Sequence, residues 1–336
     1  MGMVPDPWGA PAISRPFGQK ESYLQDSPLF KAVFLITFAT AFLFFIVSTI
    51  GLFDPSWSTN FNKSSAFYLF FLLLNTPPIG VATIWLNVGM TILYSIFFLS
   101  MLYFGVKRRK GPAINNPVIF YGAMASFALL ISLVMVLIEQ AMGIQIGGTS
   151  IENELHTQPY LGFVQLIFAP FAEEFGFRIL PLGLISVYFV ARAHGTGLDS
   201  LAAFVMPGIM RKKYGLGLTV WDYILIIATS ILFGAAHYLF GAWDPGKIIS
   251  AAFVGFILAF GFMKFGIFVD IPIHWFFNGF TSVTLIVPSS TNFYAIAVLW
   301  SLLSGVVATV FLIVIAVERR GRAESLPSLR EQDPFS

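Results

Sequence analysis

Two adjacent glutamates and an arginine stand inside a long apolar stretch of the chain. Glu173, Glu174 and Arg178 occupy the hexapeptide EEFGFR, within a run from Tyr160 to Val190. A charged side chain at the centre of a membrane-spanning helix costs about 2.5–3.5 kcal/mol on insertion scales, so such residues are usually paired and functional. We therefore expect these three residues to belong to a functional site.

The spacing of the hexapeptide separates the tasks of its two carboxylates. Glu174 and Arg178 are four residues apart, so they share a helix face and can pair. Glu173 is rotated by about 100° from Glu174 around the helix and can face a cavity instead. A carboxylate in that position suits a general base that takes a proton from water. The alternative is an ion pair that only holds helices together, and for Glu174 and Arg178 the two roles are compatible.

Histidine and asparagine occupy two further apolar segments. His237 ends the sequence FGAAH, and His274 and Asn278 are four residues apart on one helix face. A His/Asn pair can donate two hydrogen bonds to one oxygen atom, which is the task of an oxyanion hole. Each residue alone could equally form hydrogen bonds between helices. All of these side chains are polar groups in apolar segments that can accept protons or donate hydrogen bonds. We therefore expect Glu173, His237, His274 and Asn278 to converge on one polar cavity.

Two other acidic residues are candidates of lower rank. Asp270 precedes His274 by four residues and could orient its imidazole as a hydrogen-bond acceptor. We favour the alternative, in which Asp270 lies at the membrane interface near the start of its helix. Glu139 ends another apolar segment, and we expect it at the interface as well.

The composition indicates a membrane protein. Of the 336 residues, 57% are hydrophobic and 11% are charged, and the mean hydropathy is +0.81. Apolar runs of 18 or more residues are typical of membrane spans. The sequence therefore predicts an all-α, polytopic membrane helix bundle with about eight transmembrane helices. The expected spans are 32–53, 80–106, 118–138, 160–180, 222–240, 248–265, 267–287 and 294–317.

Two apolar segments depart from a simple span. The run 66–74 is too short to cross, and we expect it at the interface or as a re-entrant piece. The run that begins at Tyr160 is too long for one straight span, and Pro181 is expected to bend it or to start an extension.

The lysines and arginines orient the spans. Sixteen of the nineteen fall on one side of the predicted bundle, Lys63 and Lys247 fall on the other, and Arg178 lies within the membrane. The positive-inside rule then places both termini in the cytoplasm. The Gly-rich, basic connection 193–217 lies on that side too. We expect the cavity to open to the cytoplasm or laterally to the inner leaflet.

Several kinds of chemistry are excluded by what the sequence lacks. It contains no cysteine, which excludes disulfides, a thiol nucleophile and thiolate metal ligands. The zinc-protease motif HExxH and the phosphate-binding motif GxxxxGK[ST] are both missing. Glu173, His237 and His274 could nevertheless ligate zinc with one position open. We favour a site without a metal or other cofactor, with zinc as the alternative.

The three motifs in order resemble the CAAX protease and bacteriocin-processing (ABI) family, which includes the type II CAAX prenyl endopeptidases. That family has EExxxR, then FxxxH, then HxxxN or HxxxD. Here Phe233 and His237 supply the second motif, and the resemblance covers about residues 160–280. The chain departs from the pattern in the long interval between its first two motifs, which the segment 193–217 fills.

The resemblance implies a role for each motif residue. Glu173 and His237 would activate a water for attack on a peptide carbonyl, and His274 and Asn278 would stabilise the oxyanion. Glu174 and Arg178 would support Glu173. The family implies an intramembrane endopeptidase that cuts near the C-terminus of a lipidated, prenylated or membrane-embedded protein or peptide. Membrane lipid is the other expected partner, and nucleic acid is not one.

Two other functions stay open from the residues alone. Glu, His and Arg in membrane helices also make up proton relays, so a proton-coupled transporter is one alternative, although no internal repeat supports it. A non-catalytic scaffold or immunity protein is the other. In each case we expect a cytoplasmic N-terminal segment over 1–31, one membrane-embedded domain over 32–317 with its motifs in 160–280, and a short cytoplasmic tail over 318–336.

Overall fold

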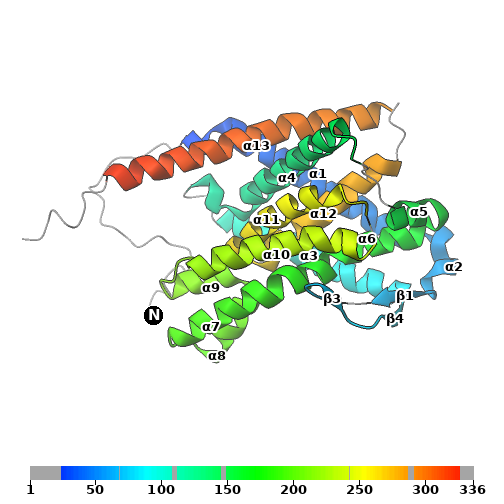
Figure 1. Cartoon of the computed structure of the whole chain (residues 1–336), viewed down its shortest axis with the longest axis horizontal. Helices are drawn as coiled ribbons and strands as arrows, with labels where there is room; N and C mark the ends of the chain where they lie inside the picture. Colours follow the sequence, from blue (N-terminus) through cyan, green and yellow to red (C-terminus); the bar gives the residue numbers. More distant parts are fainter. Residues whose placement is uncertain are drawn as a thin grey trace, which may run out of the picture.

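The chain folds into a bundle of long helices that run along a common direction (Figure 1). The computed structural model describes residues 24–325 apart from 68, 108–111, 145–148, 242 and 287–290. Most of the predicted N-terminal segment, and the tail after residue 325, therefore lie outside the described residues. The helices that build the bundle are α1 (Pro28–Leu52), α3 (Thr83–Lys107), α4 (Pro117–Ala141), α6 (Pro159–Glu174) with its continuation α7 (Leu184–Arg192), α10 (Val220–Leu239), α11 (Lys247–Phe265), α12 (Ile267–Ile286) and α13 (Asn292–Ser325).

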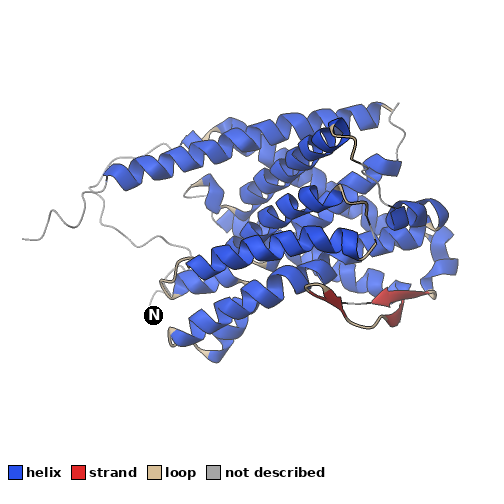
Figure 2. Cartoon of the chain, viewed as in Figure 1, coloured by secondary structure: helices blue, strands red, loops and turns tan. Residues whose placement is uncertain are grey.

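Shorter helical elements fill the connections. They are η1 (Leu24–Asp26), η2 (Pro55–Trp57), α2 (Ser58–Phe61), η3 (Ala113–Asn115), α5 (Thr149–Thr157), α8 (Gly197–Val205) and α9 (Pro207–Lys213). In the described part of the chain, seven helices are long and apolar enough to cross a membrane. Helices dominate the fold (Figure 2), so the prediction of an all-α polytopic membrane bundle is confirmed.

Helix α12 occupies the remaining predicted span, 267–287, as far as Ile286, and lies at the centre of the bundle. Every residue from Val269 to Phe277 is buried. A helix that is apolar on all sides is typical of such a central position. Helices α3, α4, α6 and α11 pack around it, and α12 carries His274 into their midst.

The long run from Tyr160 forms one continuous helical path with a wider turn in its middle. A π-helical segment, η4 (Phe175–Gly183), joins α6 to α7 and begins directly after Glu174. It contains Pro181, where we had expected a bend. Proline has no N–H for the usual bond to an i−4 carbonyl, and a π-helical stretch tolerates that gap. Such stretches are frequent at functional sites.

The short run 66–74 does not cross the bundle but forms the tip of a β-hairpin. Strand β1 (Ser64–Phe67) pairs antiparallel with β4 (Ile79–Ala82), and β2 (Phe70–Phe71) pairs with β3 (Leu74–Asn75). The ring of Phe70 packs 6.1 Å from that of Phe177 and 5.2 Å from that of Phe240. A side chain at Gly176 would overlap the Phe70 backbone, so this glycine lets the hairpin approach η4.

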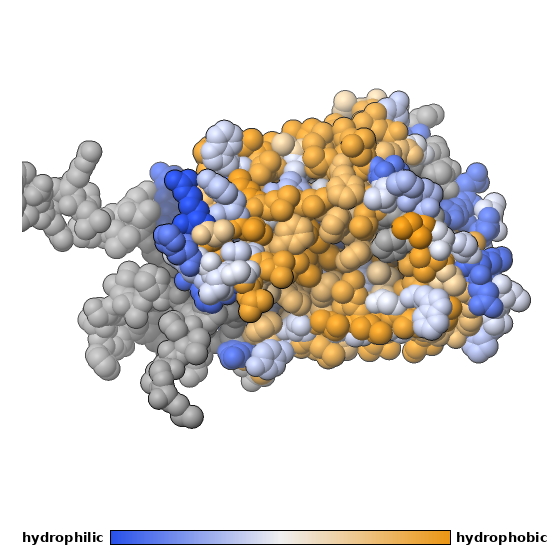
Figure 3. All heavy atoms as spheres, turned by 90° about the horizontal axis from the view of Figure 1, so that it is seen from below, coloured by the Kyte–Doolittle hydropathy of each residue, from blue (hydrophilic) through white to orange (hydrophobic). Residues whose placement is uncertain are grey.

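One end of the bundle, which we call the basic end, gathers most of the positive charge. There α3, α7, α9, α11 and α13 finish, with Lys107, Arg192, the 211–213 cluster, Lys264 and Arg319. The predicted connection 193–217 is folded into α8 and α9 at this end. An apolar belt separates the basic end from the hydrophilic surface at the opposite end of the bundle (Figure 3).

The C-terminal helix continues beyond the predicted span. The predicted span ends at 317 and the predicted tail begins at 318, but α13 reaches Ser325. The added residues are mostly Glu, Arg and Ala, which are good helix formers. Glu318 accepts a hydrogen bond of 2.7 Å from Gln25, which ties α13 to the N-terminal η1.

Candidate functional site

Glu174, Arg178 and His274 form one buried polar cluster. Arg178 Nη1 lies 3.1 Å from Glu174 Oε1, as the spacing of four residues predicts. The same Glu174 oxygen lies 2.6 Å from Nδ1 of His274 on α12. Both members of the ion pair have no exposed side-chain surface, and His274 has 2%. Arg178 also donates a hydrogen bond of 3.0 Å to the Gly255 carbonyl, so α6, α11 and α12 are joined through this cluster.

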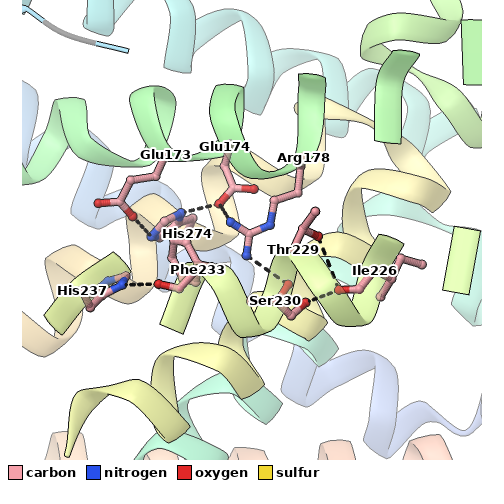
Figure 4. Close-up of polar contacts among 10 residues, drawn as sticks. Glu173, Glu174, Arg178, Ile226, Thr229, Ser230, Phe233, His237 and His274 are labelled. Carbon is pink, nitrogen blue, oxygen red and sulfur yellow. Dashed lines mark hydrogen bonds and ion pairs between the residues drawn. The ribbon is translucent and has the colours of Figure 1, made fainter. Parts of the chain in front are cut away.

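Glu173 points away from the ion pair, although it is adjacent to Glu174 in sequence. Its Oε2 lies 3.4 Å from Nε2 of His274, so the imidazole stands between the two carboxylates (Figure 4). The Glu173 side chain keeps 17% of its surface exposed and lines a cavity. One carboxylate is therefore neutralised and the other faces open space, as the helix geometry predicts.

His237 is held with one ring nitrogen available. Its Nδ1 lies 2.8 Å from the Phe233 carbonyl oxygen. A carbonyl can only accept, so Nδ1 carries the proton, and in a neutral ring Nε2 is then an acceptor, for which the described part of the chain provides no hydrogen-bond donor. The ring of Phe233 packs 4.6 Å from His237 and 5.6 Å from His274, and the Arg178 guanidinium lies 4.2 Å from its centre. Phe233 is thus the apolar centre around which the polar groups are arranged.

The four predicted catalytic residues line one cavity. Glu173, His237, His274 and Asn278 all contribute to a small chamber beside α12. Glu173 and His237 also line a larger adjoining cavity of about 320 Å³. The structure therefore brings the predicted residues together, while their individual roles stay predictions.

The larger cavity extends away from the basic end. Its walls include Asn75 of the hairpin, Glu154 of α5, Gln165 in the first half of α6, and Trp243 after α10. Asn75 is exposed, and these elements lie at the opposite end of the bundle (Figure 1). The larger cavity thus extends towards the end away from the basic loops, whereas lateral access to the inner leaflet stays a prediction. Glu173 lies near the middle of the helical path Pro159–Arg192, and the larger cavity extends from it towards the hairpin and α5.

Two acidic residues lie deeper than expected. Asp270 is fully buried within the bundle rather than exposed at an interface. The contact of 2.6 Å from His274 Nδ1 goes to Glu174, which occupies the place proposed for Asp270 as the orienting acceptor. Glu139 is 2% exposed, although its neighbours Leu137 and Ile138 at the same helix end are exposed.

One cavity residue was missed in the sequence. Lys247, the first residue of α11, lines the chamber together with Glu173 and His274. A single lysine after a turn of sequence WDPGK carries no signal that separates it from an ordinary loop lysine. Only the packing of α10 against α11 shows where its side chain lies.

The zinc alternative stays open. Within the described residues, no three His, Asp or Glu side chains are grouped closely enough to hold a metal ion. The Nδ1 atoms of His274 and His237 are engaged by Glu174 and by the Phe233 carbonyl, which leaves the Nε2 atoms directed to other partners. Ligating histidines are commonly held in this way through their second nitrogen, so these contacts do not exclude a metal.

Comparison with known proteins identifies the region that carries the site. Residues 156–280 match the family model described as type II CAAX prenyl endopeptidase Rce1-like. This region contains all three motifs and extends from the end of α5 into α12. No curated protein and no solved structure matches the chain.

Proposed function

Since residues 156–280 belong to the type II CAAX prenyl endopeptidase (Rce1-like) family, we propose that this multi-pass membrane protein cuts peptide bonds with a water activated by Glu173 and His237. The observation that carries the proposal is that the two neighbouring carboxylates have different surroundings. Glu174 is neutralised by Arg178 and contacts His274, whereas Glu173 lines the cavity together with His237.

The first step is the activation of a water molecule. The unshared lone pair on His237 Nε2 and the Glu173 carboxylate are both acceptors on one cavity, so a water between them has two sites for its proton. The water oxygen attacks the carbonyl carbon of the peptide bond, and the proton passes to one of these groups. That group then gives the proton to the leaving amine.

The second requirement is a set of donors for the oxyanion. Asn278 and His274 lie on one face of α12 and line the same chamber. Because Nδ1 of His274 donates to Glu174, Nε2 can donate to an oxyanion only when the ring carries both protons. The Glu174–Arg178 pair fixes the direction of the imidazole and thereby the position of this donor.

The side of entry follows from combining charge and geometry. The positive-inside rule places the basic end in the cytoplasm, together with both termini. The larger cavity reaches the opposite end, so we propose that substrate enters from the side away from the cytoplasm. The substrate class is a lipidated or membrane-embedded protein, cut near its C-terminus.

Peptidase assay of the purified protein tests this function. We would reconstitute the chain in liposomes and incubate it with a farnesylated CAAX peptide, with and without a metal chelator. Mass spectrometry should show cleavage near the C-terminus that the chelator does not abolish. Loss of cleavage with the chelator would instead favour the zinc alternative. No cleavage by a protein shown to be folded would favour the transporter or scaffold alternatives.

A further inference from the structure

Lys247 brings a positive charge into the chamber that holds the proposed catalytic groups. It lines this space together with Glu173, His237, His274 and Asn278. The three motifs do not include it, and the activation of water does not require it. Its role has to be sought in what else enters the chamber.

Aromatic rings, rather than carboxylates, hold the ammonium group in place. Nζ of Lys247 lies 4.5 Å from the ring centre of Trp243 and 5.7 Å from that of Phe277. Both rings also line the chamber. A cation over an aromatic face is attracted to the ring without losing its charge or its hydrogen-bond donors. The rings therefore orient Lys247 and leave its charge available.

Two carboxylates deserve comparison with this charge, Glu173 and Glu139. Glu173 lines the same chamber, and both side-chain oxygens of Glu139 are buried with no hydrogen-bond partner among the described residues. Neither forms an ion pair or hydrogen bond with Nζ of Lys247, and within the described residues no other carboxylate does. A lysine has three N–H donors, and a buried ammonium is costly unless those donors find an acceptor. Lys247 is thus a cation that could bind an anionic group of a molecule that enters the chamber.

A peptide that is cut near its end carries one suitable anion, its C-terminal carboxylate. Resting on the proposed function, we infer that Lys247 binds this carboxylate and so selects substrates with a free C-terminus close to the bond that is cut. Without such a cation, Glu173 would repel the incoming carboxylate, because like charges in a poorly solvated space disfavour each other. One extended residue spans about 3.3–3.6 Å. When the C-terminal carboxylate is held within this chamber, only a few residues therefore fit between it and the bond that is cut.

Paired peptides provide the test. We would use one farnesylated CAAX peptide in two forms, with a free C-terminal carboxylate and with a C-terminal amide. For the unmodified protein, kcat/KM should be about 10- to 100-fold higher for the carboxylate form, as expected for a hydrogen bond to a charged group. Lys247→Met should lower the value for the carboxylate form to that of the amide and leave the amide unchanged. Lys247→Arg should retain the preference, because arginine also binds carboxylates.

Lys264 provides a matched control at the other end of the same helix. Its Nζ lies 5.4 Å from the ring centre of Phe120 and 5.6 Å from that of Phe265, so it too contacts two aromatic rings. It does not line the chamber, and Lys264→Met should keep the preference for the carboxylate. Equal cleavage of both forms by the unmodified protein would overturn the inference. So would an equal loss on both forms in Lys247→Met, which indicates a structural role.

A binding measurement separates this inference from the proposed function. Both peptides are titrated against the Glu173→Gln variant, with and without Lys247→Met, and fluorescence anisotropy is recorded. If the unmodified protein does not cleave, but binding favours the carboxylate only when Lys247 is present, the peptidase proposal fails and the carboxylate site stands. If the unmodified protein cleaves, but neither binding nor turnover favours the carboxylate form, the peptidase proposal stands and the carboxylate site fails.

Discussion

Two buried arginine–carboxylate pairs lie at different levels of the bundle and differ in their surroundings. Arg178 pairs with Glu174 at 3.1 Å beside the cavity, and Arg211 pairs with Asp222 at 2.6 Å at the basic end. All four side chains are at most 2% exposed. Burial and charge alone therefore do not distinguish the two pairs.

The difference lies in what each pair is connected to. Arg211 donates to the Gly217 carbonyl and stacks on Phe189, while Asp222 accepts from the Thr219 backbone in a capping box at the start of α10. Every partner there fixes a helix end or a loop. At the other pair, Glu174 contacts His274, whose second nitrogen faces Glu173 in the cavity. A buried ion pair thus indicates a functional site when one of its partners leads to a group that faces open space.

The largest contrast should come from removing the cavity-facing groups. Glu173→Ala and His237→Ala should abolish peptide cleavage, since loss of a general base typically costs about 10²–10⁴-fold in rate. Their thermal unfolding midpoints should stay close to that of the unmodified protein. Asp222→Ala is the counterpart at the basic end and should lower the midpoint while its folded fraction keeps its turnover. Full activity of Glu173→Ala would remove Glu173 from the role of base.

The two arginines should differ in activity but not in stability. Arg178→Met and Arg211→Met each leave a buried carboxylate unpaired, which costs about 3–5 kcal/mol of folding stability. Only Arg178→Met should also reduce kcat in the folded fraction, because it frees Glu174 and with it the imidazole of His274. Urea titration and single-turnover assays measure the two effects separately. An equal loss of turnover in both variants would contradict the proposal that only the Glu174–Arg178 pair supports catalysis.

A smaller effect is expected at Asn278, the proposed oxyanion donor. Asn278→Ala should leave measurable turnover, since the loss of one such donor costs about 10²–10³-fold in kcat. Because the donor acts on the transition state, KM should change little. A change confined to KM would place Asn278 in substrate binding.

The smallest effect belongs to an exposed cluster at the basic end. Hydrogen bonds from Lys213 and Tyr214 lower the pKa of Asp199 from 3.8 to about 2. A carboxyl group with a lowered pKa stabilises the fold above its unfolded value and loses that contribution as the pH falls through the folded value. The unfolding midpoint of Asp199→Asn should therefore lie slightly below that of the unmodified protein at pH 6, and this difference should shrink between pH 4 and pH 2. Peptide cleavage at pH 7 should not change.

The spans, and the helix faces that the motif residues share, could be predicted because their signals are local. Long apolar runs mark the helices, and the spacing of Glu174 to Arg178 and of His274 to Asn278 places each pair on one helix face. The contact between His274 and Glu174 could not be predicted, because it joins residues 100 positions apart through the packing of α12 against α6. Lys247 was missed for the same reason.

Three local features were also beyond the sequence patterns. The run 66–74 is too short to distinguish a hairpin from an interfacial segment. The glycines of 193–217 resemble those of a loop. One of them, Gly208 in α9, nevertheless allows close contact with the end of α11, and Gly266, directly after α11, allows close contact with the end of α8. The direction in which the larger cavity extends depends on how the hairpin, α5 and α6 pack around it, which loop charges do not report.

The side of entry can be tested by labelling, because the native chain has no cysteine. Single cysteines at Lys212 and Asn75 mark the basic end and the wall of the cavity. In oriented vesicles, an impermeant maleimide should reach the first only from the cytoplasmic side and the second only from the other side. Labelling of both from one side would contradict the proposed route for substrate.

Hydrolysis in H₂¹⁸O tests the central claim most directly. The purified, chelator-treated protein is incubated with the farnesylated peptide in labelled water, and the products are weighed by mass spectrometry beside those of Glu173→Gln. The account predicts cleavage near the C-terminus, one ¹⁸O atom in the newly formed carboxylate, and no product from the folded Glu173→Gln variant. Equal product from Glu173→Gln, or no hydrolysis by the unmodified protein, would contradict it.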